Sequence, residues 1–331
     1  MRLDLTRRNL SWTLLSASAL LLLVWGRMKT SASGVSATGD MPLGEWLSAA
    51  AEARPHSAGI VCLILALWNS LLLTRILSRN MVLPERTYLP LILYPAMAFG
   101  CSFDPTTALP ALAAAGLMVR SFDLMIASFR RTVLLGPLFD ASLAAGIALL
   151  VWGHTAVYLL LLPIALVIFK KSAREWVVAW IGYLLPFAVC SYVYWGMGYS
   201  FGYVFERLTT HLAGAFSPVQ PLFDDIPDPV LLVFWGTCIV ATVLAATTFW
   251  RRSETMRTRA YKSFVYFLWI LFFSLLATGL ARSAAGFPLL AAPLSVVIPA
   301  YFGRHRGWIP DLIYLAMMGS IVCYDIMQIP I

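Results

Sequence analysis

The sequence predicts an all-α integral membrane protein, a single bundle of about eleven transmembrane helices. Of its 331 residues, 60% are hydrophobic and only 12% are charged, whereas an ordinary soluble domain carries about 25% charged residues. The mean hydropathy is +0.79. A soluble fold has too little interior to hide this much apolar surface. Apolar runs also recur along the whole chain, and no polar stretch between them is long enough to fold alone.

The expected spans are runs of roughly 20 mostly apolar residues, the length that a helix needs to cross the hydrocarbon core. The apolar stretch 138–170 is too long for one crossing, and a break at 152–154 divides it into two. The spans are expected at about 10–26, 57–77, 87–102, 106–128, 138–153, 155–170, 176–195, 229–250, 263–281, 286–302 and 310–328. One transmembrane domain then covers 1–331, with longer external segments at about 27–56 and 196–228. Within the first segment, the stretch from Pro42 to Ala53 is expected to form a short helix on the membrane surface.

The basic residues predict the orientation of the bundle. With eleven spans and a cytoplasmic N-terminus, 19 of the 24 Lys and Arg residues fall on the cytoplasmic side. Such an excess is typical of cytoplasmic loops, so we expect the C-terminus to be external. The formal net charge of +8 comes from short clusters between apolar spans, a pattern that indicates topology and no nucleic-acid partner. The five basic residues expected outside are Arg27, Lys29, Arg54, Arg207 and Arg282.

The sequence has no Walker loop, no GxGxxG after a strand and no HExxH, which are motifs of soluble enzymes. Its five cysteines are scattered and form no CxxC or Cys/His cluster, so they are interpreted as small core residues. The sequence therefore predicts no metal site and no cofactor. The candidates for function are ionisable residues at membrane depth or at the external mouth, where a charge is costly.

Three charged residues of the external face are candidates for chemistry on a substrate. Asp40 and Glu45 lie in the first external segment, where either carboxylate alone is a candidate general base. Arg282 lies at the outer end of a late span, against the positive-inside trend. Its guanidinium suits bidentate binding of a lipid phosphate or pyrophosphate. The alternative for Arg282 is an ordinary interfacial arginine on lipid head groups.

Charged residues also fall within or at the start of expected spans. Arg120 and Asp123 lie three residues apart, a spacing that places them on one helix face and favours a neutralised pair. Asp140 opens the next span and is expected to cap that helix and to complement its dipole. The alternative for all three is contact with a substrate or an ion. His154 and His211 are expected to be ordinary polar residues of external segments.

Several short motifs of the chain point to a family. They include Phe139-Asp140-Ala141-Ser142, Phe169-Lys170-Lys171, Arg174-Glu175-Trp176, Arg79-Asn80 and Pro293-Leu294-Ser295. With these motifs, most of the chain resembles an uncharacterised polytopic inner-membrane protein family of Bacteroidota, a domain of unknown function. The resemblance implies a multi-pass protein of the bacterial inner (cytoplasmic) membrane, and it implies no activity.

A second resemblance depends on the order of features along the middle of the chain. An acidic residue is followed by Gly146-Ile147-Ala148-Leu149-Leu150, then by an apolar span, a basic turn, Gly182 and Pro186. This order is similar to the middle helices of the GT-C-class glycosyltransferases, which use polyprenyl-phosphate-linked sugars. The resemblance implies glycosyl transfer at the outer leaflet, with Asp40 or Glu45 as the base. This chain lacks the external domain or longer external loops that are usual in that class.

Three functional hypotheses follow from the sequence. The first is a protein of cell-envelope biogenesis that works among membrane lipids on a polyprenyl-phosphate-linked substrate, with Arg282 holding the phosphate. The second is a transporter or flippase of a lipid-like or small anionic substrate, with Arg120, Asp123 and Asp140 lining the path. The third is a non-catalytic membrane scaffold. The long acidic external segment favours the enzyme, and the charges within spans favour the transporter.

A topology experiment tests the expected number of crossings. Reporter proteins fused after Arg252 and after Ile331 should report opposite sides of the membrane, because three crossings are expected between these two points. The measurement is the activity of a reporter that functions on one side only. The same side at both positions would show that the span count is wrong.

Overall fold

The protein is described by a computed structural model that covers residues 10–26, 41–80, 87–99, 104–128, 135–215, 229–251, 258–281, 286–302 and 308–327. Within these ranges every regular element is a helix, which confirms the all-α class. The helices are α1 (Leu10–Gly26), α2 (Pro42–Ala53), α3 (Pro55–Asn80), α4 (Pro90–Ala98), α5 (Pro105–Ser128), α6 (Leu135–Val151), η1 (Gly153–Leu159), α7 (Leu161–Ile168), α8 (Ala173–Gly196), α9 (Tyr203–Ala215), α10 (Pro229–Trp250), α11 (Thr258–Ala281), α12 (Phe287–Val297), α13 (Pro299–Phe302) and α14 (Trp308–Met327).

The apolar helices fall where the sequence predicts spans. Six of them, α3, α5, α8, α10, α11 and α14, are long and apolar enough to cross a membrane. Four further apolar stretches are shorter: 15–26, 135–151, 153–168 and 287–302. Helix α4 has only 9 residues, which is about 14 Å of helix. These features are those of a helical membrane protein, whereas the eleven crossings and the orientation of the termini stay predictions.

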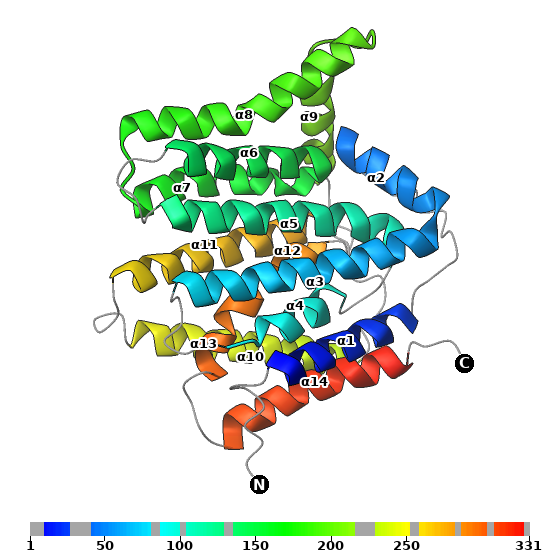
Figure 1. Cartoon of the computed structure of the whole chain (residues 1–331), viewed down its shortest axis with the longest axis vertical. Helices are drawn as coiled ribbons and strands as arrows, with labels where there is room; N and C mark the ends of the chain where they lie inside the picture. The colour runs from blue at the N-terminus through cyan, green and yellow to red at the C-terminus, as the bar shows by residue number, and fades with distance from the viewer. Residues whose placement is uncertain are drawn as a thin grey trace.

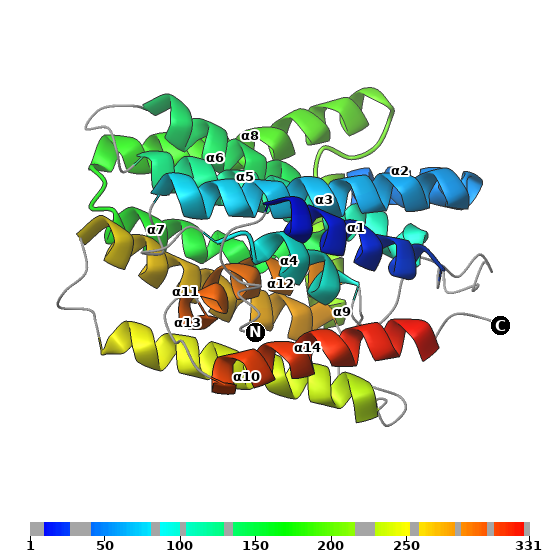
Figure 2. The same cartoon turned by 60° about the horizontal axis from the view of Figure 1, so that its bottom comes forward.

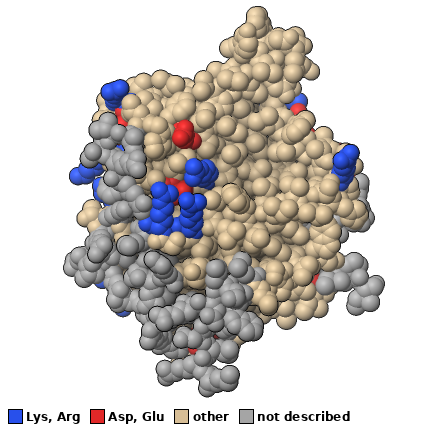
Figure 3. All heavy atoms as spheres, viewed as in Figure 1, with Lys and Arg blue, Asp and Glu red and all other residues tan. Residues whose placement is uncertain are grey.

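The long helices run along one common direction, and α9 lies across it (Figures 1 and 2). At one end of the bundle α3 and α10 end and α8 and α11 begin, and we call this the basic end. Figure 3 shows Lys and Arg side chains gathered there, over the ends of α3 and α5. The opposite end carries α2 and α9, and we call it the α2–α9 end. The helix expected at Pro42–Ala53 is confirmed as α2.

Helix α12 forms the centre of the bundle. All 11 of its residues are buried, and it packs against α3, α4, α5, α10 and α11. All 9 residues of its neighbour α4 are buried as well. Each of the two helices contains an internal proline, Pro95 or Pro293. Such breaks are tolerated at membrane depth where neighbouring protein surrounds the backbone, which is the situation of both helices.

One buried polar contact joins three helices around this centre. The Asn69 amide of α3 donates to the Tyr94 hydroxyl of α4 at 3.1 Å and to the Leu112 carbonyl of α5 at 3.1 Å. A Cβ atom on Gly116 would lie 2.6 Å from the Asn69 Oδ1 atom. The glycine therefore makes room for the asparagine, and the amide fixes the relative position of α3, α4 and α5.

Helices α6 and α8 approach each other through two glycines. A Cβ atom on Gly182 of α8 would lie 2.8 Å from the Phe139 carbonyl oxygen of α6. A Cβ atom on Gly146 of α6 would overlap the Tyr183 carbonyl of α8. Small residues that let two backbones meet are the usual contact between helices in lipid, where dispersion and not water expulsion drives association.

Substitution of Gly182 by alanine tests this contact. The added methyl group must push apart two backbones, so Gly182→Ala should lower the free energy of unfolding by about 1–3 kcal/mol. Gly236→Ala on α10 is the matched control, because nothing lies within 4 Å of a Cβ atom at that position. Thermal unfolding of the purified protein in detergent measures both. Equal stability of the two variants would contradict the close approach of α6 and α8.

Candidate functional site

The two expected external segments meet at the α2–α9 end of the bundle. Glu45 of α2 and Arg207 of α9 form an ion pair, with 3.1 Å between Glu45 Oε1 and a terminal guanidinium nitrogen. The two side chains are 45% and 43% exposed, respectively. The contact therefore brings a carboxylate and a guanidinium from distant parts of the chain to one place that solvent can reach.

Three tyrosines lie beside this ion pair. The Arg207 Nε–H donates to the Tyr203 hydroxyl at 3.0 Å, and the Arg207 Cζ atom lies 5.5 Å from the centre of the Tyr203 ring. The Tyr203 ring centre lies 5.1 Å from that of Tyr194 and 4.9 Å from that of Tyr199. We call these five residues, Glu45, Tyr194, Tyr199, Tyr203 and Arg207, the outer cluster. Its groups can accept and donate hydrogen bonds and can hold an anion.

Two histidines hold α9 against the bundle. The Nε2 atom of His211 lies 3.2 Å from the Nδ1 atom of His154 in η1, and the ring centres are 4.3 Å apart. One of these nitrogens donates and the other accepts. The Trp152 ring packs on His154 at 4.8 Å. Gly153 is required here, since a Cβ atom on it would overlap the His211 ring. Helix α9 is thus fixed from η1 by the histidine pair and from α2 by Glu45.

The sequence predicts an external segment at 196–228 and misses the helix α9 within it. The signal that identifies α9 is helical spacing of its apolar residues. Val204 is buried, and Leu208 and Leu212 are half-buried at positions four and eight residues later. Glu206 and Thr209 on another face are exposed. This is the pattern of an amphipathic helix on a protein surface, and it explains why His154 and His211 come together.

Of the three external candidates, only Glu45 falls within the described residues. Asp40 and Arg282 both lie outside them. The partner that the structure gives Glu45 is Arg207. The sequence predicts that Arg207 lies outside the membrane, but it indicates no role for this residue.

Arg120 and Asp123 form the pair that their spacing predicts, with 3.3 Å between Arg120 Nη1 and Asp123 Oδ2. The Asp123 side chain is 7% exposed and that of Arg120 is 51% exposed, so the arginine reaches outward from a buried acid.

The expected capping role of Asp140 is wrong. Helix α6 begins at Leu135 and has no acidic residue in its first turn, because Pro137 is tolerated there and does not delay the helix. Asp140 is exposed.

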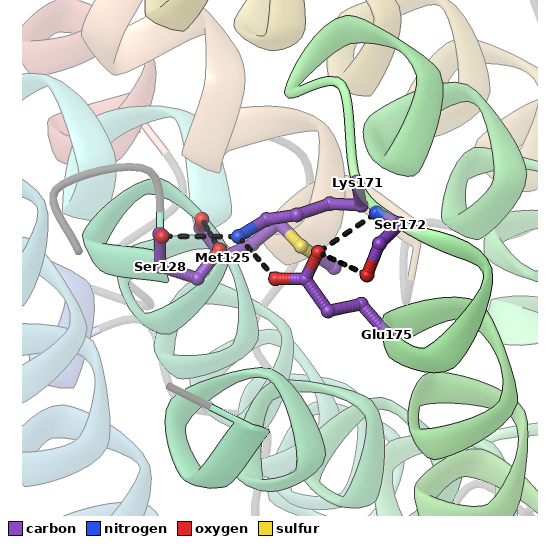
Figure 4. Close-up of polar contacts among 5 residues, drawn as sticks. All are labelled: Met125, Ser128, Lys171, Ser172 and Glu175. Carbon is purple, nitrogen blue, oxygen red and sulfur yellow. Dashed lines mark hydrogen bonds and ion pairs between the residues drawn. The ribbon is translucent and has the colours of Figure 1, made fainter. Parts of the chain in front are cut away.

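A second polar cluster lies at the basic end (Figure 4). The Lys171 ammonium donates to the Ser128 carbonyl at the end of α5 at 3.0 Å and to Glu175 Oε1 in α8 at 3.0 Å. The other Glu175 oxygen accepts from the Ser172 backbone N–H at 2.8 Å. The Lys171 side chain is only 7% exposed. The cluster Ser128–Lys171–Glu175 therefore joins α5 to α8 and is a structural anchor.

The turn before this anchor has a strained backbone residue. Lys170 has a φ angle of +52°, and the next N–H, that of Lys171, bonds to the Leu166 carbonyl at 2.9 Å. This left-handed residue ends α7 and directs Lys171 toward α5. In the sequence, Lys170 and Lys171 form a basic cluster between spans and part of a family motif, and neither feature predicts this contact. The spacing Ser172-x-x-Glu175 is the signal that locates the start of α8.

Comparisons with known proteins identify no relative of this chain. No protein family, no curated protein and no solved structure matches this chain significantly. In the part of the chain that the structure describes, no three His, Cys, Asp or Glu side chains group closely enough to hold a metal ion. Among the described residues, the outer cluster is the group of charged and polar side chains best placed to bind a substrate.

Cross-linking tests whether α9 lies against η1. With the native cysteines replaced, His154→Cys and His211→Cys together should be bridged by a short bifunctional thiol reagent, because the native rings touch. The cross-link is measured by mass spectrometry after digestion. His154→Cys with Thr209→Cys is the control, since Thr209 is on the exposed face of α9. Equal yields from the two pairs would mean that α9 is not docked as described.

Proposed function

We propose that this chain is a cell-envelope protein of the bacterial inner membrane that acts on a polyprenyl-phosphate-linked substrate. Its α2–α9 end faces the outer leaflet, and the reaction is glycosyl transfer of the GT-C kind. The observation that carries the proposal is the Glu45–Arg207 ion pair within the outer cluster. A carboxylate, a guanidinium and three phenols at the end of an apolar bundle match a substrate with a polar, anionic head and a lipid tail.

The exposure of the ion pair makes it exchangeable. An exposed pair of this kind contributes at most about 1 kcal/mol, so a phosphate group can replace the carboxylate on Arg207. A guanidinium binds phosphate oxygens through two parallel N–H···O bonds. The exchange releases Glu45 beside the bound phosphate, where its carboxylate is free to accept a proton.

The proposed reaction is a displacement at the sugar. Glu45 takes the proton of an acceptor hydroxyl, and that oxygen forms a bond to the anomeric carbon. The bond between this carbon and the phosphate oxygen breaks, and the polyprenyl phosphate leaves with the electron pair. Asp40 is the second candidate base, and Arg282 is the candidate second phosphate ligand. Both roles come from the sequence.

The transporter alternative has weaker support. It requires Arg120, Asp123 and Asp140 to line a path, yet Asp123 is already paired with Arg120 and Asp140 is exposed. In a scaffold, none of these residues would matter individually.

Turnover by the full-length protein in lipid nanodiscs tests the proposal, with a polyprenyl-phosphate sugar as the probe and released polyprenyl phosphate measured by mass spectrometry. Glu45→Gln should lower kcat about 100-fold or more, because it removes the base. Arg207→Lys should chiefly raise KM, because an ammonium lacks the bidentate geometry. Glu52→Gln is the control, being an exposed acid on the same helix. Full turnover by Glu45→Gln, or none by the unmodified protein, would overturn the proposal.

A further inference from the structure

The outer half of α8 and the turn into α9 leave the bundle. In Figures 1 and 3 this part projects beyond the neighbouring helices. Helix α8 contains Pro186, and beyond it much of the helix surface is exposed. We call residues 192–205 the α8–α9 arm. Its exposed large apolar side chains are Tyr192, Val193, Trp195, Met197, Tyr199, Phe201 and Phe205.

The arm has no charge. No Asp, Glu, Lys or Arg occurs in the sequence between Glu175 and Glu206. Trp195 is 56% exposed and Met197 is 67% exposed, so the protein leaves more than half of each of these residues uncovered. A contiguous apolar surface of this kind is unusual in contact with water and indicates a membrane or a partner surface.

The length of α8 places the arm at a membrane interface. The 24 residues of α8 span about 36 Å, slightly more than the roughly 30 Å of a hydrocarbon core. Lys170 and Lys171 lie directly before the helix, at the basic end. When these lysines lie at one interface, the last turn of α8 reaches the other. Trp and Tyr are the residues that are enriched at membrane–water interfaces.

The turn that follows keeps the chain at this level. Gly198 has a φ angle of +94°, a conformation that side chains rarely adopt. Helix α9 then runs across the end of the bundle, and the first charged residues, Glu206 and Arg207, are on it. The change from aromatic to charged residues between 205 and 206 corresponds to the change from lipid to water at a head-group boundary.

We propose that the α8–α9 arm is inserted into the head-group interface of the bilayer beside the bundle, and that phospholipid covers its aromatic side chains. Tyr194, Tyr199 and Tyr203 belong both to the arm and to the outer cluster, so Arg207 lies at the level of the lipid phosphates. A ligand of this cluster is therefore an amphiphile that arrives sideways from the bilayer. The position of the arm holds whether or not the protein transfers a sugar.

Fluorescence quenching in vesicles of phosphatidylethanolamine and phosphatidylglycerol tests the arm. The cysteine-free full chain carries Met197→Cys labelled with an environment-sensitive fluorophore, and nitroxide head-group lipid and aqueous iodide are the quenchers. The label should be quenched at least twofold more by the lipid than by iodide. Thr209→Cys, one turn after the exposed Glu206, is the control and should show the reverse order.

Phe201→Cys provides a second, independent label on the arm and should behave as Met197→Cys does. Stronger quenching of both labels by iodide would overturn the proposal, because the arm would then lie in water. Protection of both labels from both quenchers would also overturn it, because a second copy or another protein would then cover the arm.

Discussion

A backbone in hydrocarbon must satisfy its hydrogen bonds within the protein, and this requirement is strictest for α12. That helix is buried at every position and packs against α3, α4, α5, α10, α11 and α13. Its internal Pro293 removes one backbone donor, and Pro95 does the same in the adjacent α4. Both breaks are sheltered by protein, so no lipid-exposed backbone results. The arrangement of α3, α5, α10 and α11 around α12 follows from this need for cover.

Within the described residues, polar side-chain contacts join helices that are far apart in the chain. Asn69 links three helices, and the Tyr158 hydroxyl of η1 lies 2.6 Å from the Ser274 hydroxyl of α11. At the basic end Lys171 connects α5 with α8. In lipid, hydrophobicity does not select one helix neighbour over another, because lipid tails are as apolar as leucine. Small residues and these contacts therefore carry much of the specificity.

The two ends of the bundle differ in kind. At the basic end, the Lys171 and Asp123 side chains are nearly buried, and each is in an ion pair. Buried, paired groups of this kind are typical of structural contacts. At the α2–α9 end, Glu45 and Arg207 are paired but almost half exposed, beside aromatic rings that extend toward the arm. An exposed pair is easily exchanged for a ligand, whereas a buried pair is costly to separate. This difference is the reason to look for the substrate at the α2–α9 end.

The sequence by itself determined the all-α class, the positions of the apolar helices, the surface helix at 42–53 and the pairing of Arg120 with Asp123. These features depend on local composition and on spacing within one helix, which a sequence displays directly. Only the tertiary structure decided that Glu45 meets Arg207, that His154 meets His211 and that α12 is central. Each of these contacts joins segments far apart in the chain. In lipid, the apolar faces of different helices look alike, so the sequence pattern does not reveal which segments become neighbours.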